Sequence, residues 1–249
     1  MDIFDKPTLK SSLIFISTYV ISANIGSTLS EKMNVNYLGE IILLLALSVF
    51  LIIYVKKNKL TKDIGLTKIS FYEIKNNLLY LPLFIMVLAN GVFFFDRTIT
   101  FKNIVLSIVF MILVAFLEEL LFRGLLFKSI KANNTTKTAI FISGSTFGFG
   151  HIINLLNGYT IINQIIQIVM ATLIGIILSV LFVRTKSIIP GMIFHFFFNI
   201  ASTLSIEVAP LYDYISASII FVIDLIYLFY LLKCMQQNEE IYDKHNHKV

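Results

Sequence analysis

Two adjacent carboxylates and an arginine lie inside an otherwise apolar run of helix length, from Met111 to Phe127. A charged side chain at membrane depth costs about 2.5–3.5 kcal/mol, so such groups are functional by default. Glu119 and Arg123 are four residues apart with the acid first, the favourable order for a helical ion pair. Glu118 lies about 100° round the helix from Glu119. We therefore expect a paired Glu119 and a Glu118 with no partner nearby in sequence; the alternative is a structural ion network that joins helices.

A second polar cluster runs from Ser143 to His151. Gly144 and Gly148 form a G-x-x-x-G pair, which lets helices approach closely. Gly148 and Gly150 also leave the surroundings of His151 free of side chains. This pattern predicts that the backbone of this helix closes on the polar cluster, bringing His151 with it. The alternative is a packing motif with a hydrogen-bonded core histidine.

A third cluster runs from Pro190 to Asn199. Pro190 is expected near a helix start, where its missing N–H costs little. His195 and Asn199 are four residues apart and share one helix face, while three phenylalanines between them cover the other faces. The pattern predicts a polar pair that points inward from an aromatic helix. The alternative is two polar side chains that satisfy each other.

The depth of these groups suggests one shared site. At a rise of 1.5 Å per residue, Glu118, His195, Asn199 and His151 lie about 10–18 Å from the predicted cytoplasmic ends of their helices. We therefore expect them to meet around one water-accessible cavity that opens to the cytoplasm. Their types suit hydrolysis: Glu as a base for water, His as a proton shuttle or metal ligand, and Asn as an oxyanion donor.

The elements that must position these groups are transmembrane helices. The chain has 249 residues, 57% hydrophobic and 14% charged, whereas soluble domains carry about 25% charged residues. A span needs about 20 mostly apolar residues, which predicts an all-α polytopic bundle of eight helices. We expect a single integral membrane domain, 1–249, with the catalytic core at 103–206 and a short frayed polar tail at 236–249. The predicted spans are 11–29, 37–55, 74–95 (kinked at Pro82), 103–126, 139–157, 160–183, 188–206 and 214–233.

The distribution of basic residues predicts the orientation. With the N-terminus inside, sixteen Lys and Arg residues fall in inner segments and three, Lys32, Arg97 and Lys102, in outer ones. By the positive-inside rule both termini are cytoplasmic. The net charge of +5 therefore reflects topology and does not indicate nucleic-acid binding. Abundant Ile, Lys, Asn and Phe fit an AT-rich bacterium, so we expect a multi-pass protein of a bacterial plasma membrane.

The three clusters, in this order, resemble the signature of the CPBP family, which comprises the CAAX prenyl endopeptidases and the bacteriocin-processing and immunity-associated membrane proteases. The family pattern is E-E-x-x-x-R, then F-x-x-x-H, then H-x-x-x-N or D. Every signature position is matched, over roughly residues 103–206. The matching residues are Glu118, Glu119, Arg123, Phe147, His151, His195 and Asn199.

The resemblance implies an intramembrane endopeptidase that cleaves a peptide or membrane protein near the cytoplasmic face. By that resemblance Glu118 activates water with the help of His151, His195 and Asn199 stabilise the oxyanion, and the neighbouring Glu119–Arg123 pair supports the site. The family has been described both as metalloproteases and as glutamate-type peptidases.

The sequence leaves the metal question open. Glu118, His151 and His195 could form a zinc site of the His₂Glu type with an open fourth position. There is no H-E-x-x-H helix, and Asn is a poor zinc ligand. Our interpretation therefore favours metal-independent chemistry, with zinc as the alternative cofactor.

Two other functions remain as alternatives. One is a non-catalytic membrane partner or bacteriocin-immunity protein that acts by binding, for which the full catalytic set is unnecessary. The other is a small transporter that uses the carboxylate and histidines as a proton relay, but no inverted repeat supports it. By family analogy, a peptide pheromone, a bacteriocin precursor or a membrane regulator is a more plausible substrate than a prenylated CAAX protein.

Overall fold

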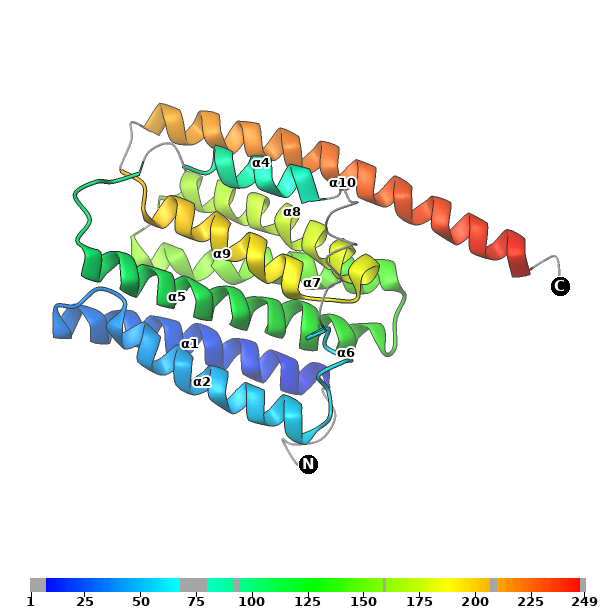
Figure 1. Ribbon diagram of the computed structural model, residues 1–249, viewed down its shortest axis with the longest axis horizontal. Coiled ribbons are helices and arrows are strands. Elements are labelled where there is room, and N and C mark those ends of the chain that lie inside the picture. The colour runs from blue at the N-terminus through cyan, green and yellow to red at the C-terminus, as the bar shows by residue number, and fades with distance from the viewer. Residues whose placement is uncertain (1–7, 68–79, 92–94, 159, 207–209, 247–249) are drawn as a thin grey trace.

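The computed structural model describes residues 8–67, 80–91, 95–158, 160–206 and 210–246. These residues form the predicted all-α membrane bundle, with its helices packed side by side along one direction (Figure 1). Five of the helices in this part of the chain are long and apolar enough to cross a membrane. They are Leu9–Met33, Leu38–Lys57, Phe101–Lys131, Ile161–Thr185 and Leu211–Met235.

The described helical elements follow the order of the predicted spans. The seventh of the predicted spans is shorter here, and the fifth changes from an α-helix to a 3₁₀-helix at His151. In chain order the described elements are α1 (Leu9–Met33), α2 (Leu38–Lys57), α4 (Leu81–Ala89), α5 (Phe101–Glu119), the π-helix η3 (Leu120–Leu126), α6 (Phe127–Lys131), α7 (Thr136–Gly150), the 3₁₀-helix η4 (His151–Asn157), α8 (Ile161–Thr185), α9 (Ile189–Thr203) and α10 (Pro210–Asn246).

Four of these helices begin at a threonine that the sequence places just before an apolar run. Thr8, Thr100, Thr135 and Thr160 each accept a hydrogen bond from a main-chain N–H in the first turn of their helix. Such caps satisfy donors that have no partner inside the helix. The starts that hydropathy predicted for these four spans lie within three residues of the observed starts of α1, α5, α7 and α8.

Two expectations for the ends of the bundle are corrected. Pro82 was expected to kink a helix from within, but it lies in the first turn of α4, where its missing N–H breaks no helical bond; residues 74–79 of that predicted span lie outside the described residues. The segment from Gln236 onward was expected to be frayed, but α10 continues as a helix to Asn246 and extends past the other helices (Figure 1).

Glycines allow close helix pairs. A Cβ on Gly144 would lie 2.6 Å from the Ile176 main-chain nitrogen, and one on Gly148 would lie 2.7 Å from that of Thr172. The predicted close approach of α7 is therefore confirmed, but its partner is the backbone of α8. The prediction that these glycines bring the α7 backbone against the polar cluster is wrong, because the face they share is turned towards α8.

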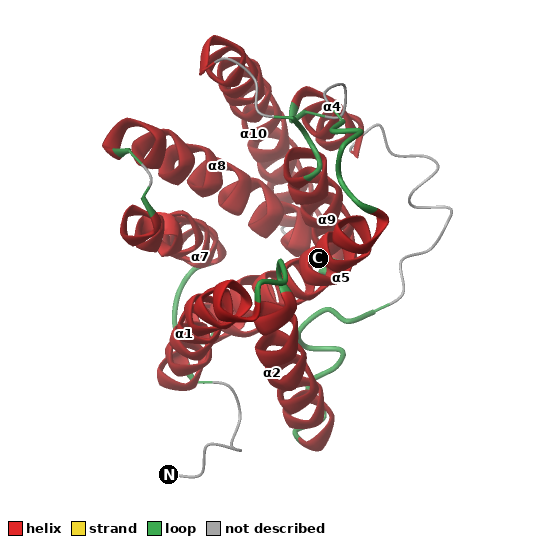
Figure 2. Cartoon of the chain, turned by 90° about the vertical axis from the view of Figure 1, so that its left-hand side faces the viewer, coloured by secondary structure: helices red, strands yellow, loops and turns green. Residues whose placement is uncertain are grey.

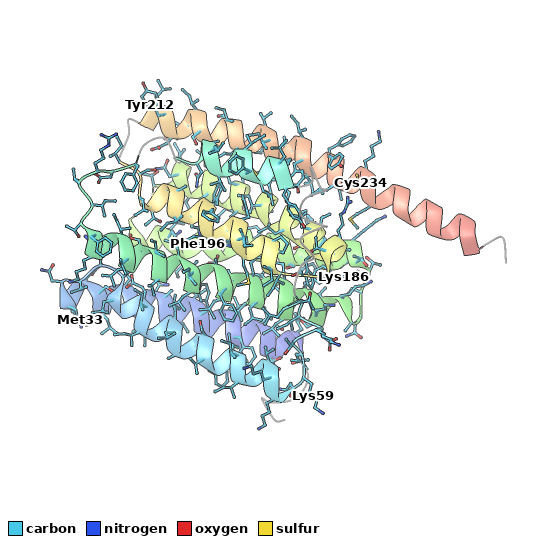
Figure 3. The ribbon with its side chains drawn as sticks, viewed as in Figure 1. Met33, Lys59, Lys186, Phe196, Tyr212 and Cys234 are labelled. Atoms are coloured by element: carbon cyan, nitrogen blue, oxygen red, sulfur yellow. The ribbon has the colours of Figure 1, made fainter. Side chains whose placement is uncertain are left out.

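The two ends of the bundle differ in charge. Figure 3 places Lys59 and Lys186 at one end, and Met33 and Tyr212 at the other. We call the first the lysine-rich end. The assignment of this end to the cytoplasm remains a prediction from the positive-inside rule.

The half of the bundle nearest the lysine-rich end is tightly filled. From Leu120 to Ile130 every residue is buried except the half-buried Lys128. η3 packs against α1 and α7, while α5 packs against α2 and α9. Seen along the bundle, α1 and α2 lie on one side of α5 and α9 on the other (Figure 2). Because α5 is central, the adjacent carboxylates of Glu118 and Glu119 contact different neighbouring helices.

Candidate active site

Both oxygens of the Glu118 carboxylate have partners from other helices. The Tyr19 hydroxyl of α1 donates a hydrogen bond of 2.6 Å to Glu118 Oε1. The ring nitrogen Nε2 of His195 lies 3.1 Å from Glu118 Oε2. The expectation that Glu118 lacks a partner nearby in sequence is met, but it is not isolated, because two helices distant in the chain hold its carboxylate.

Glu119 and Arg123 form the predicted ion pair. Arg123 Nη1 donates to Glu119 Oε1 at 2.8 Å, and the two side chains are 0% and 1% exposed. The other terminal nitrogen of Arg123 donates to the Gly175 carbonyl at 3.2 Å. On α9, a Cβ at Gly191 would lie only 2.5 Å from Glu119 Oε2. Gly191 therefore gives this carboxylate the space to sit between α5 and α9.

Arg123 belongs to the π-helix η3, which the sequence did not predict. In η3 the Phe127 N–H bonds to the Phe122 carbonyl five residues earlier, and the Ser143 hydroxyl of α7 donates to the same carbonyl at 2.8 Å. Single π-helical turns inside α-helices occur often at functional sites. Here the wider turn directly follows the two carboxylates and ties their helix to α7.

The ring of Phe147 lies at the centre of the polar cluster. Its centroid is 5.2 Å from that of His151 and 5.6 Å from that of His195, in both cases edge to face. The Arg123 guanidinium carbon lies 4.5 Å from the same centroid, within the range of a cation–π contact. The aromatic position of the F-x-x-x-H motif therefore sets the spacing between the two histidines.

The tautomer of His151 follows from its local contact. His151 is the first residue of η4, and its Nδ1 lies 3.1 Å from the Phe147 carbonyl oxygen one turn earlier. A carbonyl only accepts hydrogen bonds, so Nδ1 carries the proton in this arrangement. In the neutral ring, Nε2 is then left with a lone pair that can accept a proton.

His195 lies between the two carboxylates. Its Nε2 faces Glu118, while its Nδ1 lies 3.5 Å from Glu119 Oε1 without the geometry of a hydrogen bond. The ring is buried. A single α9 side chain thus contacts both acids that the E-E motif provides.

A cavity of about 220 Å³ begins at Glu118 and His151. It follows α1 past Asn24 to Ser27 and reaches Glu40 in the first turn of α2. These positions lie on the side of Glu118 away from the lysine-rich end. The polar residues that line it are Tyr19, Asn24, Ser27, Glu40, Glu118, His151 and Asn154.

Two parts of the predicted cavity are corrected. We expected its mouth at the cytoplasmic, lysine-rich end, but η3 and α6 fill that half of the bundle with buried side chains. We also expected Asn199 beside the other three groups, but Asn199 does not line the cavity. It lies on α9, on the other side of α5, and its side chain makes no hydrogen bond with the described residues. His195 does not line the cavity either, and it reaches the site through its contacts with Glu118 and the Phe147 ring.

The donor geometry decides how well the site fits a metal ion. Within the described residues, no three His, Cys, Asp or Glu side chains converge as ligands of one metal ion. His195 Nε2 faces the Glu118 carboxylate at 3.1 Å and does not converge with His151 on a common position. Glu118, His151 and His195 therefore do not fit the three-ligand zinc site that the sequence left open.

A carboxylate and an imidazole thus line one cavity within a helical membrane bundle. Residues 100–201 match the family model described as type II CAAX prenyl endopeptidase Rce1-like. This match confirms the resemblance: the region that carries the site is that of a CPBP family membrane protease. It supports intramembrane CAAX-type endopeptidase activity in general, and hence peptide substrates in a lipid bilayer. A comparison with curated proteins found no match.

Two residues of the site escaped the sequence reasoning. Tyr19 lies outside the matched segment, in the middle of the predicted span 11–29, and belongs to none of the three motifs. Gly191 follows Pro190, which explained the local sequence as a helix start. Both act through neighbours distant in the chain, so no local spacing could have indicated them.

Proposed function

We propose that this chain is an intramembrane endopeptidase in which Glu118 and His151 activate the water that cleaves a peptide bond. The observation that carries the proposal is that these two side chains, from α5 and η4, line one cavity. Glu118 is 9% exposed, so the carboxylate is reachable from the cavity although it is deep in the bundle. Few other functions require a carboxylate and a proton-accepting imidazole at the end of a narrow cavity.

The reaction proceeds by general-base catalysis. A water molecule beside Glu118 loses a proton to the carboxylate as its oxygen bonds to the substrate carbonyl carbon. The unprotonated Nε2 of His151 orients this water and can take the second proton. When the C–N bond breaks, the leaving amine takes a proton from Glu118, which restores the carboxylate. His195 keeps Glu118 in place through Oε2, and no step passes through a metal ion.

Of the supporting roles that the family implies, the proposal keeps that of the Glu119–Arg123 pair and leaves out that of Asn199. The Glu119–Arg123 pair remains a support, because it fixes the helix turn that carries Glu118. Asn199 receives no oxyanion role in this proposal, since it does not line the cavity. The substrate is a peptide segment that enters along α1 from the end opposite the lysine-rich end. If the lysine-rich end is cytoplasmic, the substrate reaches Glu118 from the outer half of the membrane.

Comparative peptidomics of cells tests the proposal. Cells with the wild-type chain are compared with cells carrying Glu118→Ala, Glu118→Gln or His151→Ala. All three variants should accumulate the same uncleaved peptides. Glu31→Gln, which changes an exposed carboxylate on α1, is the matched control and should process them normally.

The binding-protein alternative gives the opposite result. A chain that acts by binding retains its cellular phenotype when Glu118 is replaced by Ala, and no peptide depends on that residue. This outcome would refute the peptidase proposal.

A further inference from the structure

Tyr19 is a polar group of the cavity that no motif includes. It lies on α1, outside the segment 100–201 that matches the family model, and its side chain is 8% exposed. Its hydroxyl donates to Glu118 Oε1 at 2.6 Å, and the residue lines the cavity together with Glu118 and His151. An O–H donor is thus held directly beside the proposed base.

The position of this hydroxyl suits a developing negative charge. A carbonyl attacked by water on Glu118 must lie within a few ångströms of that carboxylate. Donors that stabilise an oxyanion work at about 2.7–3.1 Å from it. The Tyr19 hydroxyl, already 2.6 Å from Glu118, is within reach of such a carbonyl oxygen, whereas Asn199 does not line the cavity.

We infer that Tyr19 is a catalytic residue whose phenol O–H binds Glu118 at rest and the oxyanion when water attacks the substrate carbonyl. This inference rests on the proposed peptidase function. It assigns to α1 the oxyanion-stabilising role that the family resemblance gave to His195 and Asn199.

The proton transfer itself releases the phenol. As the water oxygen bonds to the carbonyl carbon, one water proton moves to Glu118 and the carbonyl π electrons move to oxygen. A protonated carboxyl is a weaker acceptor than a carboxylate, while the new oxyanion is a strong one. The Tyr19 hydroxyl turns to the oxyanion and keeps its own proton. When the C–N bond breaks, the electron pair re-forms the carbonyl, the amine takes the proton from Glu118, and Tyr19 returns to the carboxylate.

The test uses the full chain in lipid nanodiscs and an internally quenched peptide built on a sequence that accumulates in Glu118→Ala cells. Tyr19→Phe removes only the hydroxyl. We expect kcat to fall by about 100- to 1,000-fold, with KM changed by less than about threefold, as for an interaction made only in the transition state. Tyr54→Phe is the matched control, because Tyr54 is fully buried but does not line the cavity. It should retain wild-type kcat.

A second measurement separates catalysis from support. Fluorotyrosines incorporated at position 19 keep the hydroxyl and its packing but make the phenol progressively more acidic. A donor to the oxyanion makes kcat change in step with phenol acidity, which a structural hydroxyl does not. This series also decides the matter if Tyr19→Phe fails to fold.

The outcomes distinguish this inference from the function on which it rests. If turnover depends on Glu118 but Tyr19→Phe retains kcat within about threefold, or the fluorotyrosine series is flat, Tyr19 is not catalytic and the peptidase proposal stands. If the wild-type chain shows no Glu118-dependent turnover, both proposals fail.

Discussion

Replacement of one member of the Glu119–Arg123 pair should destabilise the protein far more than replacement of Glu118. The two side chains are 1% and 0% exposed and are joined at 2.8 Å. Removal of one partner from a buried pair costs about 3–5 kcal/mol, because the remaining charge has no compensation. We therefore expect Glu119→Gln and Arg123→Gln each to lower the free energy of unfolding by about this amount.

The double variant tests whether the loss comes from the remaining charge. A buried pair replaced by apolar residues of similar volume is often neutral in stability. Glu119→Met with Arg123→Met should therefore be more stable than either single Gln variant. The Gly175 carbonyl that Arg123 contacts does not lose all its partners, because the Ser179 hydroxyl also donates to it at 2.8 Å.

The measurement is unfolding of the purified protein by SDS titration in mixed micelles, supported by thermal scans. Glu118→Gln serves as the control, because a neutral amide at the cavity leaves no charge without a partner. It should unfold close to the wild type while losing peptidase activity. The reasoning would be refuted if Glu118→Gln were the least stable of the three single variants, or if the double variant were no more stable than the singles.

The remaining predictions concern packing, metal dependence and topology. Gly148→Ala should lose about 1–3 kcal/mol of stability by overpacking, because its Cβ would lie 2.7 Å from an α8 main-chain nitrogen. Gly150→Ala, whose Cβ would lie 4.0 Å from the nearest atom, should unfold like the wild type. Equal stabilities of the two variants would contradict the close α7–α8 contact. Zinc chelators should leave Glu118-dependent turnover unchanged, since no three-ligand group forms among the described residues; activity that is lost on chelation and restored by zinc would overturn this. Reporter fusions after residues 65, 132 and 240 should all read cytoplasmic, and an external signal at 132 would reverse the predicted orientation.

Much of the fold follows from features that are local in the sequence. Apolar runs of span length predict a membrane bundle, because unpaired backbone groups cannot be left in lipid. Threonines before these runs mark helix starts, since their hydroxyls satisfy free N–H groups. The Glu119–Arg123 contact follows from a spacing of four residues on one helix, and the glycine spacing of α7 predicts a close helix pair.

The three motifs, taken in their order along the chain, are also enough to indicate a shared site. Each motif places a polar side chain on an apolar helix. Because lipid offers no hydrogen-bond partners, such side chains must contact one another or a water-filled cavity. That requirement predicts the Glu118–His195 contact in general terms. It does not specify which atoms meet, or which polar residues remain outside the group.

The tertiary structure alone decides what surrounds Glu118. Its hydrogen-bond donor, Tyr19, is 99 residues away, and the cavity beside it leads away from the lysine-rich end because η3 and α6 fill the other half. Asn199 shares a helix face with His195 but does not line that cavity. The helix α5 lies between Asn199 and the cavity. Sequence spacing fixes which residues share a face of one helix. The rotation of each helix about its axis depends on packing against all its neighbours at once, and this rotation determines which faces meet at the site.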